Sequence, residues 1–379
     1  MDSGNESKRV SRGGAVERCD VPPGRWVHRI AVLAVCLVWP LIWVGGLVTT
    51  YDAGMAVPDW PGTYGYNLFL YPYETWLLGP FDLFIEHGHR LLGAVVGMVA
   101  IALVVVSWLS EPRRWVRWLS VGVLVAVIAQ GVLGGARVLL TDRALAMIHG
   151  CTGPAFFALC VAAAAVTSRW WWALGGAEGR AGGGLTATRS GGTTRRAVTG
   201  PGWGAVWLAA SLSLACYVQL VFGAQLRHVQ PAASPGSFAH TLALHLLTAV
   251  IVWLLAAGTA VALRRCGDLS LSRPALILIG LVTLQVALGV GTWVVKYGFP
   301  QILGWFPGAV GYVVRSKGWG SSLLITSHVA TGSFILAVSC LVLIRLLRYR
   351  HGLASVASGD AADQASFVSR LRPETADVH

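Results

Sequence analysis

Long runs of apolar residues, separated by short polar segments, dominate the chain from residue 27 to residue 347. Each run has the roughly 20 residues that a helix needs to cross about 30 Å of hydrocarbon. Runs this long and continuous are helical, because a spanning segment must satisfy its backbone hydrogen bonds internally. The pattern predicts an all-α polytopic membrane protein with eight transmembrane helices, at residues 27–50, 84–110, 115–136, 143–168, 203–226, 239–263, 274–296 and 321–347.

Composition and charge agree with this prediction. Charged residues make up 12% of the chain, against about 25% in soluble proteins. The formal net charge of +12 does not indicate a nucleic-acid partner, because 22 of the 29 Lys and Arg lie in the two tails and in alternate loops. The positive-inside rule then places both termini in the cytoplasm. We therefore expect a multi-pass protein of the cytoplasmic (inner) membrane, in contact with the lipid bilayer and not with nucleic acid.

A segment rich in Gly, Thr, Ala and Arg, residues 173–202, separates four spans from four. Because each half has an even number of spans, the halves enter the membrane in the same orientation. We predict two tandem four-helix bundles related by a pseudo-twofold axis. The expected organisation is an N-terminal cytoplasmic tail (1–26), a first bundle (27–172), a cytoplasmic linker (173–202), a second bundle (203–347) and a C-terminal cytoplasmic tail (348–379).

Short repeated motifs support the duplication. The odd-numbered spans contain "LIWVG", "QGVLG", "QLVFG" and "QVALG", which end at Gly45, Gly134, Gly223 and Gly289. Each even-numbered span has a histidine followed four residues later by Gly or Ala, which puts both residues on one helical face. These histidines are His89, His149, His245 and His328.

The four histidines share one depth, roughly 8–10 Å inside the membrane. A single histidine at this depth is compatible with an ordinary interhelical hydrogen bond, but four at matched repeat positions favour two bis-histidine sites. Zinc usually takes four ligands or an open water position, whereas haem iron takes two axial ligands. Two haems fit the pattern best, and the Gly or Ala one turn after each histidine would leave room for a flat macrocycle.

A carboxylate distinguishes the two halves. Glu86 lies three residues before His89 on the same helical face, and Leu242 occupies the matching place before His245. Glu86 is interpreted as a residue of the chemistry, with a helix-start carboxylate or a partner for Arg90 as the alternatives. His87 lies on another face and is interpreted as an interfacial residue.

Two loops add candidate contacts. Residues 51–83 contain many aromatic residues and no Lys or Arg, which indicates either a cover for a flat apolar ligand or an ordinary aromatic belt. Residues 297–320 contain Arg315 and Lys317, which could meet haem propionates or simply face water.

The motifs "EHGHR" and "GGLVTTYDAGMAVPDWP", with eight spans and one histidine in each even span, resemble the haem A synthase family over residues 27–347. The resemblance implies oxidation of a methyl group of haem O to the formyl group of haem A, the cofactor of haem-copper terminal oxidases. It implies that His89 and His149 bracket the substrate haem, with Glu86 as a catalytic residue, and that His245 and His328 ligate a resident haem b.

The resemblance also bears on the mechanism and on partners. Some members have a cysteine pair in the first outward loop, but here Val57 precedes "PDWP" and the loop has no cysteine. Glu86 would stabilise positive charge at the methyl carbon or accept a proton. Candidate partners are a haem O synthase, oxidase assembly factors and a second copy of the chain. The main alternative is a diheme b-type cytochrome that passes electrons from a quinol, and the next is a transporter built from tandem repeats.

Overall fold

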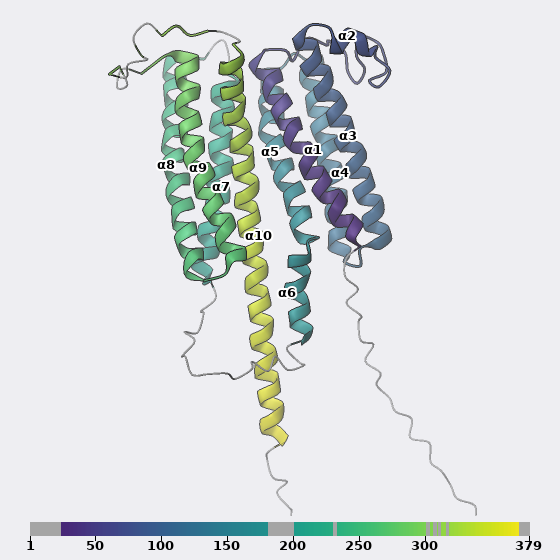
Figure 1. The fold of residues 1–379 in the computed structure, drawn as a ribbon, viewed down its shortest axis with the longest axis vertical. Helices are drawn as coiled ribbons and strands as arrows, with labels where there is room; N and C mark the ends of the chain where they lie inside the picture. Colours follow the sequence, from purple (N-terminus) through teal and green to yellow (C-terminus); the bar gives the residue numbers. More distant parts are fainter. Residues whose placement is uncertain are drawn as a thin grey trace, which may run out of the picture.

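The computed structural model describes residues 24–180, 201–229, 233–300, 304–305, 309, 312–315 and 318–370, and eight of its helices are long and apolar enough to cross a membrane. The predicted eight-span all-α fold is confirmed, and each span ends within a few residues of its predicted limits (Figure 1). The spans are α1 (Arg25–Thr50), α3 (Phe81–Ser110), α4 (Arg114–Leu139), α5 (Arg143–Val166), α7 (Trp203–Arg227), α8 (Pro235–Arg265), α9 (Leu269–Tyr297) and the Trp319–Gly352 part of α10.

Local sequence explains where several of these helices begin. The Asp142 side chain accepts hydrogen bonds from the amides of the first turn of α5, and Asp268 does the same for α9. Ser234 caps α8, where Pro235 follows in the first turn. Such caps satisfy amides that have no partner within the helix, so these helix starts are encoded by single polar residues beside apolar runs.

The spans form two groups of four. Helices α1, α3, α4 and α5 pack around one another, as do α7, α8, α9 and α10 (Figure 1). The groups meet mainly through α10, which packs on α5 and α1. At this junction the rings of Trp39, Phe157 and Phe334 lie 5.0–6.3 Å apart, and Phe157 is fully buried. Aromatic packing therefore joins the two halves near the middle of the spans.

Two helices extend beyond the spans at the end opposite the short helix α2 (Tyr73–Leu77). The segment expected to begin a linker at residue 173 is still helical, in α6 (Arg169–Arg180), and α10 continues to Arg370 through the expected C-terminal tail. Arg345 and Arg348 lie over the rings of Trp170 and Trp171, and these cation–π contacts favour the extension. Residues 1–23, 181–200 and 371–379 of the expected tails and linker lie outside the described residues.

Candidate functional site

The structure brings the four candidate histidines together in two pairs, both toward the end of the molecule that carries α2. The rings of His89 on α3 and His149 on α5 have centroids 6.5 Å apart and are mutually perpendicular. The rings of His245 on α8 and His328 on α10 have centroids 6.4 Å apart at 71°. Each half of the molecule therefore contains one facing histidine pair of nearly the same geometry.

Each histidine ring lies against a glycine of a neighbouring odd-numbered span. A Cβ added at Gly45, Gly134, Gly223 or Gly289 would lie only 2.8, 3.3, 3.2 or 3.1 Å from the Cε1 atom of His89, His149, His245 or His328. These are the glycines that end the repeated motifs. These glycines thus let an imidazole approach the backbone of the facing helix: a Cβ would clash at Gly45, and at the other three it would be tighter than ordinary contact.

The same approach orients the rings. Each imidazole faces the backbone of the residue four positions before its glycine, which is Leu41, Gln130, Gln219 or Gln285. The four histidine Nδ1 atoms are buried and form no hydrogen bond of normal geometry. Any bond from them to the backbone carbonyls of these four residues is therefore long. A histidine whose Nδ1 is directed at a backbone carbonyl presents Nε2 for coordination.

Glutamines of the repeated motifs tie the helix pairs together beside the histidines. Gln130 donates to the Thr152 hydroxyl at 2.6 Å, Gln219 accepts from Thr248, and Gln285 donates to the His328 carbonyl at 2.8 Å. Two of the glycines that follow the histidines by one turn lie against these glutamines. Gly153 faces the side chain of Gln130, and Gly332 faces that of Gln285. A Cβ at Gly93, by contrast, would meet no atom within 4 Å. The space for a macrocycle beside these positions stays a prediction.

The geometry of both pairs fits a metal ion held between two imidazoles. Two metal–nitrogen bonds of about 2 Å, plus roughly 1 Å from each nitrogen to its ring centre, place the centroids about 6 Å apart. Within the described residues, no three His, Cys, Asp or Glu side chains gather where they could hold a metal ion. Each pair thus offers two axial donors, which is the protein contribution that haem iron needs.

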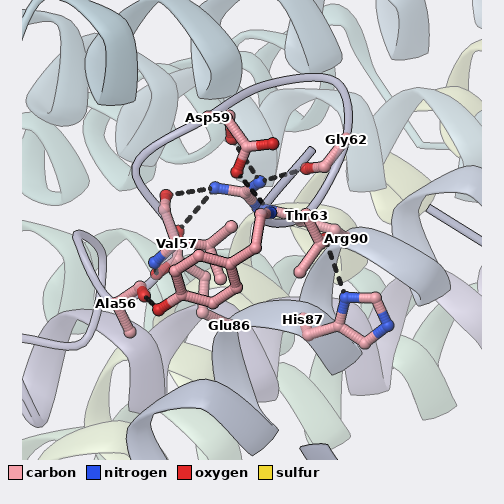
Figure 2. Close-up of polar contacts among 9 residues, drawn as sticks. Ala56, Val57, Asp59, Gly62, Thr63, Glu86, His87 and Arg90 are labelled. Carbon is pink, nitrogen blue, oxygen red and sulfur yellow. Dashed lines mark hydrogen bonds and ion pairs between the residues drawn. The ribbon is translucent and has the colours of Figure 1, made fainter. Parts of the chain in front are cut away.

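Glu86 lies in a buried polar network beside the first pair (Figure 2). Its Oε1 accepts from Arg90 Nη2 at 2.9 Å, and its Oε2 accepts from the Val57 amide at 2.9 Å. Arg90 also donates to the carbonyls of Val57, Asp59 and Gly62 at 2.6–2.8 Å. The ion pair with Arg90 is therefore present, and through it α3 holds the loop that follows α1.

This loop, residues 51–66, covers the end of the first helix group. The Trp60 ring lies where a Cβ on Gly135 of α4 would be, and the Arg137 guanidinium packs equally closely on Gly54. Burial opposes the charge of Asp59, but hydrogen bonds from the Gly65 and Tyr64 amides outweigh it and keep the pKa of Asp59 below its ordinary value. The Asp-Trp-Pro motif thus folds the loop through Asp59 and fastens it to α4 through Trp60.

His87 also belongs to this cover. It is 1% exposed, its Nδ1 lies 3.0 Å from the Thr63 hydroxyl, and the rings of Tyr71 and Trp76 pack on it. The interpretation of His87 as an interfacial residue is wrong, because its own helical face is the one that the loop covers. Periodicity places a residue on a face but does not reveal which loop will pack there.

The second helix group has no equivalent cover among its described residues. Only residues 228–234 separate α7 from α8, and Leu246, which matches Arg90, is 58% exposed. In the 297–320 loop, Arg315 is exposed and Lys317 lies outside the described residues. The halves thus share the histidine pair and differ in the polar network above it.

Two arginines near the histidine pairs were not singled out by the sequence pattern. Arg137 follows Gly134 by three residues on α4, and Arg227 follows Gly223 by four residues at the end of α7. Both lie about one helical turn from a glycine that touches an imidazole. They could have been recognised as two of the few basic residues at the end of the spans that carries little positive charge.

Comparison with protein families agrees with this architecture. A family model described as COX15-CtaA, cytochrome oxidase assembly protein, matches residues 28–301. The match begins in α1 and continues past α9, so it includes three of the four histidines and the whole 51–66 loop. No curated protein matches the chain.

Proposed function

The chain belongs to the COX15-CtaA family of cytochrome oxidase assembly proteins, and from this premise we propose that it is a haem A synthase. The reaction would oxidise a methyl group of haem O to the formyl group of haem A. The observation that supports this most directly is a histidine pair in each half, of which, in the part of the chain that the structure describes, only the first lies under a loop bonded to a buried carboxylate. Two similar sites with unequal surroundings suit one reacting and one resident haem.

We assign haem O to His89 and His149, and a resident haem b to His245 and His328. When bound, haem b supplies a one-electron redox centre. The glycine contacts position all four imidazoles, and the 51–66 loop, bonded to Glu86, would limit access of water to the first pair once a ligand is bound. A substrate that must be oxidised without side reactions benefits from such a cover.

The methyl group would take an oxygen atom from water and lose two electrons and two protons to give an alcohol. The alcohol would then lose two more electrons and two protons to give the aldehyde, with the electrons passing to a separate acceptor and the protons to solvent. The Glu86 carboxylate lies one turn before His89 and accepts hydrogen bonds from Arg90 and from the Val57 amide. We assign it to stabilising positive charge that develops at the methyl carbon or to accepting a proton.

The proposed setting is the cytoplasmic membrane, with the α2 end facing outward. Of the 29 Lys and Arg, 22 lie in the tails and in the loops at the opposite end, as the positive-inside rule requires for a cytoplasmic face. A haem O synthase as substrate donor, oxidase assembly factors and a second copy of the chain are proposed partners on the same grounds.

Extraction of the bound haems tests the proposed function. Protein purified from cells that make haem O should yield haem B together with haem O, its alcohol or haem A, identified by chromatography and mass. Haem B alone in both sites would instead identify a diheme b-type cytochrome, which the near-identical geometry of the two pairs also suits. Protein without haem would favour the transporter reading.

Substitution of Glu86→Gln should lower haem A formation by about a hundredfold, the scale of a lost general base, and leave the haem b spectrum unchanged. Glutamine keeps an oxygen for the Val57 amide, so the variant removes charge with little change of shape. Product formed per haem b is the measurement. Glu74→Gln, on exposed α2, is the matched control, and wild-type product from Glu86→Gln would remove Glu86 from the mechanism.

A further inference from the structure

Five basic residues lie at the α2 end of the molecule, on or next to helices of both halves. We call them the basic seam; they are Arg137 near the end of α4, Arg143 at the start of α5, Arg227 at the end of α7, His228 after it and Lys296 near the end of α9. The two ion pairs of the described residues, Arg90–Glu86 and Arg113–Glu111, include none of them. The seam is thus a concentration of positive charge at the end of the spans that otherwise holds little of it.

His228 shows how closely these charges converge. Burial and, after it, the charges of the four other seam residues together lower the pKa of His228 to about 4. Its Nε2 faces Gly150 of the first half, next to His149. Four cationic side chains that act on one imidazole make the local potential positive.

Arg227 is the most constrained member of the seam. Its Nη2 donates to the Gly46 carbonyl at 2.6 Å and to the Thr50 hydroxyl at 2.9 Å, both on α1 of the other half. Its Nη1 is buried and has no hydrogen-bond partner. A buried cation with an unpaired N–H group is energetically unfavourable unless an acceptor binds that group. The Nη1 atom of Arg227 is therefore suited to bind an anion.

The seam also has a fixed position relative to both pairs. Arg227 lies one turn beyond Gly223, the glycine that contacts His245. Its guanidinium also donates to the carbonyl of Gly46, and the preceding residue, Gly45, contacts His89. Arg137 lies one turn beyond Gly134, which touches His149. A flat ligand held by either pair would therefore have its edge on the α2 side close to a guanidinium.

We propose that the basic seam is a carboxylate-binding site that anchors the propionate groups of porphyrins held by the two histidine pairs. Arg227 serves the His245–His328 site and Arg137 serves the His89–His149 site. This inference rests on the proposed function, since it requires haem at both pairs. It also replaces Arg315 and Lys317 as the candidate propionate partners, because the seam lies beside the pairs.

The test compares haem B with its dimethyl ester, in which the propionates carry no charge. Full-length protein stripped of haem, in nanodiscs of phosphatidylcholine, is titrated with each and followed by the low-spin absorption band. Wild type should bind the free acid at least about tenfold more tightly, the scale of a hydrogen bond between charged groups. Arg227→Gln should abolish that preference at the His245–His328 site, leave it at the His89–His149 site, and lower the midpoint potential of the second-site haem. Arg114→Gln, at an exposed position on α4, should change neither.

Other results would overturn the proposal. One such result is that wild type binds acid and ester with equal affinity, and another is that Arg227→Gln weakens the binding of both equally. Either result would show that haem binds without propionate contacts, and that Arg227 only connects the two halves. Loss of phosphatidylglycerol binding in Arg227→Gln with an unchanged preference for the acid would make the seam a lipid headgroup site. No low-spin band with either porphyrin would refute the proposed function itself.

Discussion

Protein with His245→Ala or His328→Ala is expected to purify without the low-spin haem of the second helix group. Each variant removes one of the two imidazoles whose centroids lie 6.4 Å apart, and no third histidine, cysteine or carboxylate among the described residues is placed to replace it. Bis-histidine ligation is lost when either axial donor is lost. The low-spin band in reduced-minus-oxidised spectra should lose the amplitude of one haem, and the haem content per chain should fall by one.

The matched control is His240→Ala, an exposed histidine five residues earlier on the same helix, which should keep the wild-type spectrum. His89→Ala and His149→Ala should also keep the resident haem, because they belong to the other half. A wild-type low-spin spectrum in both His245→Ala and His328→Ala would show that the resident site has been assigned to the wrong pair.

The eight spans and the candidate histidines could be predicted because membrane insertion makes sequence unusually informative. Apolar length determines where helices cross, and an ionisable residue inside a span is rare enough to indicate a site. The repeated Gln and Gly were visible as a pattern, but their contacts were not. That Gly134 admits His149, and that Gln130 holds Thr152, depends on how two helices face each other.

The remaining features depend on loops and on contacts between distant segments. The loop-to-helix bonds of Arg90 and the burial of His87 follow from the path of the 51–66 loop, which helical periodicity does not determine. Arg227 looked like an ordinary residue at the end of a span, and only the folded structure shows that its side chain reaches α1 to bond Gly46 and Thr50. Polar contacts across long sequence separations are thus the part of the site that sequence left open.

Arg90→Met is expected to destabilise the protein by about 3–5 kcal/mol, the usual cost of removing one partner of a buried ion pair. Glu86, 2% exposed, would be left with only the Val57 amide as partner, and three loop carbonyls would lose their donor. The 51–66 loop should then open locally. Hydrogen exchange of the Val57 amide should accelerate by about a hundredfold or more, and the apparent melting temperature should fall.

The Glu86→Gln/Arg90→Met double variant separates charge from shape. It leaves no unpaired buried charge, so it should recover part of the stability lost in Arg90→Met, since uncharged partners avoid most of the desolvation penalty. The Val57 amide should nevertheless remain faster in exchange than in wild type, because the carbonyls of Val57, Asp59 and Gly62 still lack their donor. Arg114→Met, at an exposed position on α4, should behave as wild type. Wild-type stability and Val57 exchange in Arg90→Met would mean that Trp60 and Asp59 hold the loop without the ion pair, and that the cover of the first site does not depend on the Glu86–Arg90 contact.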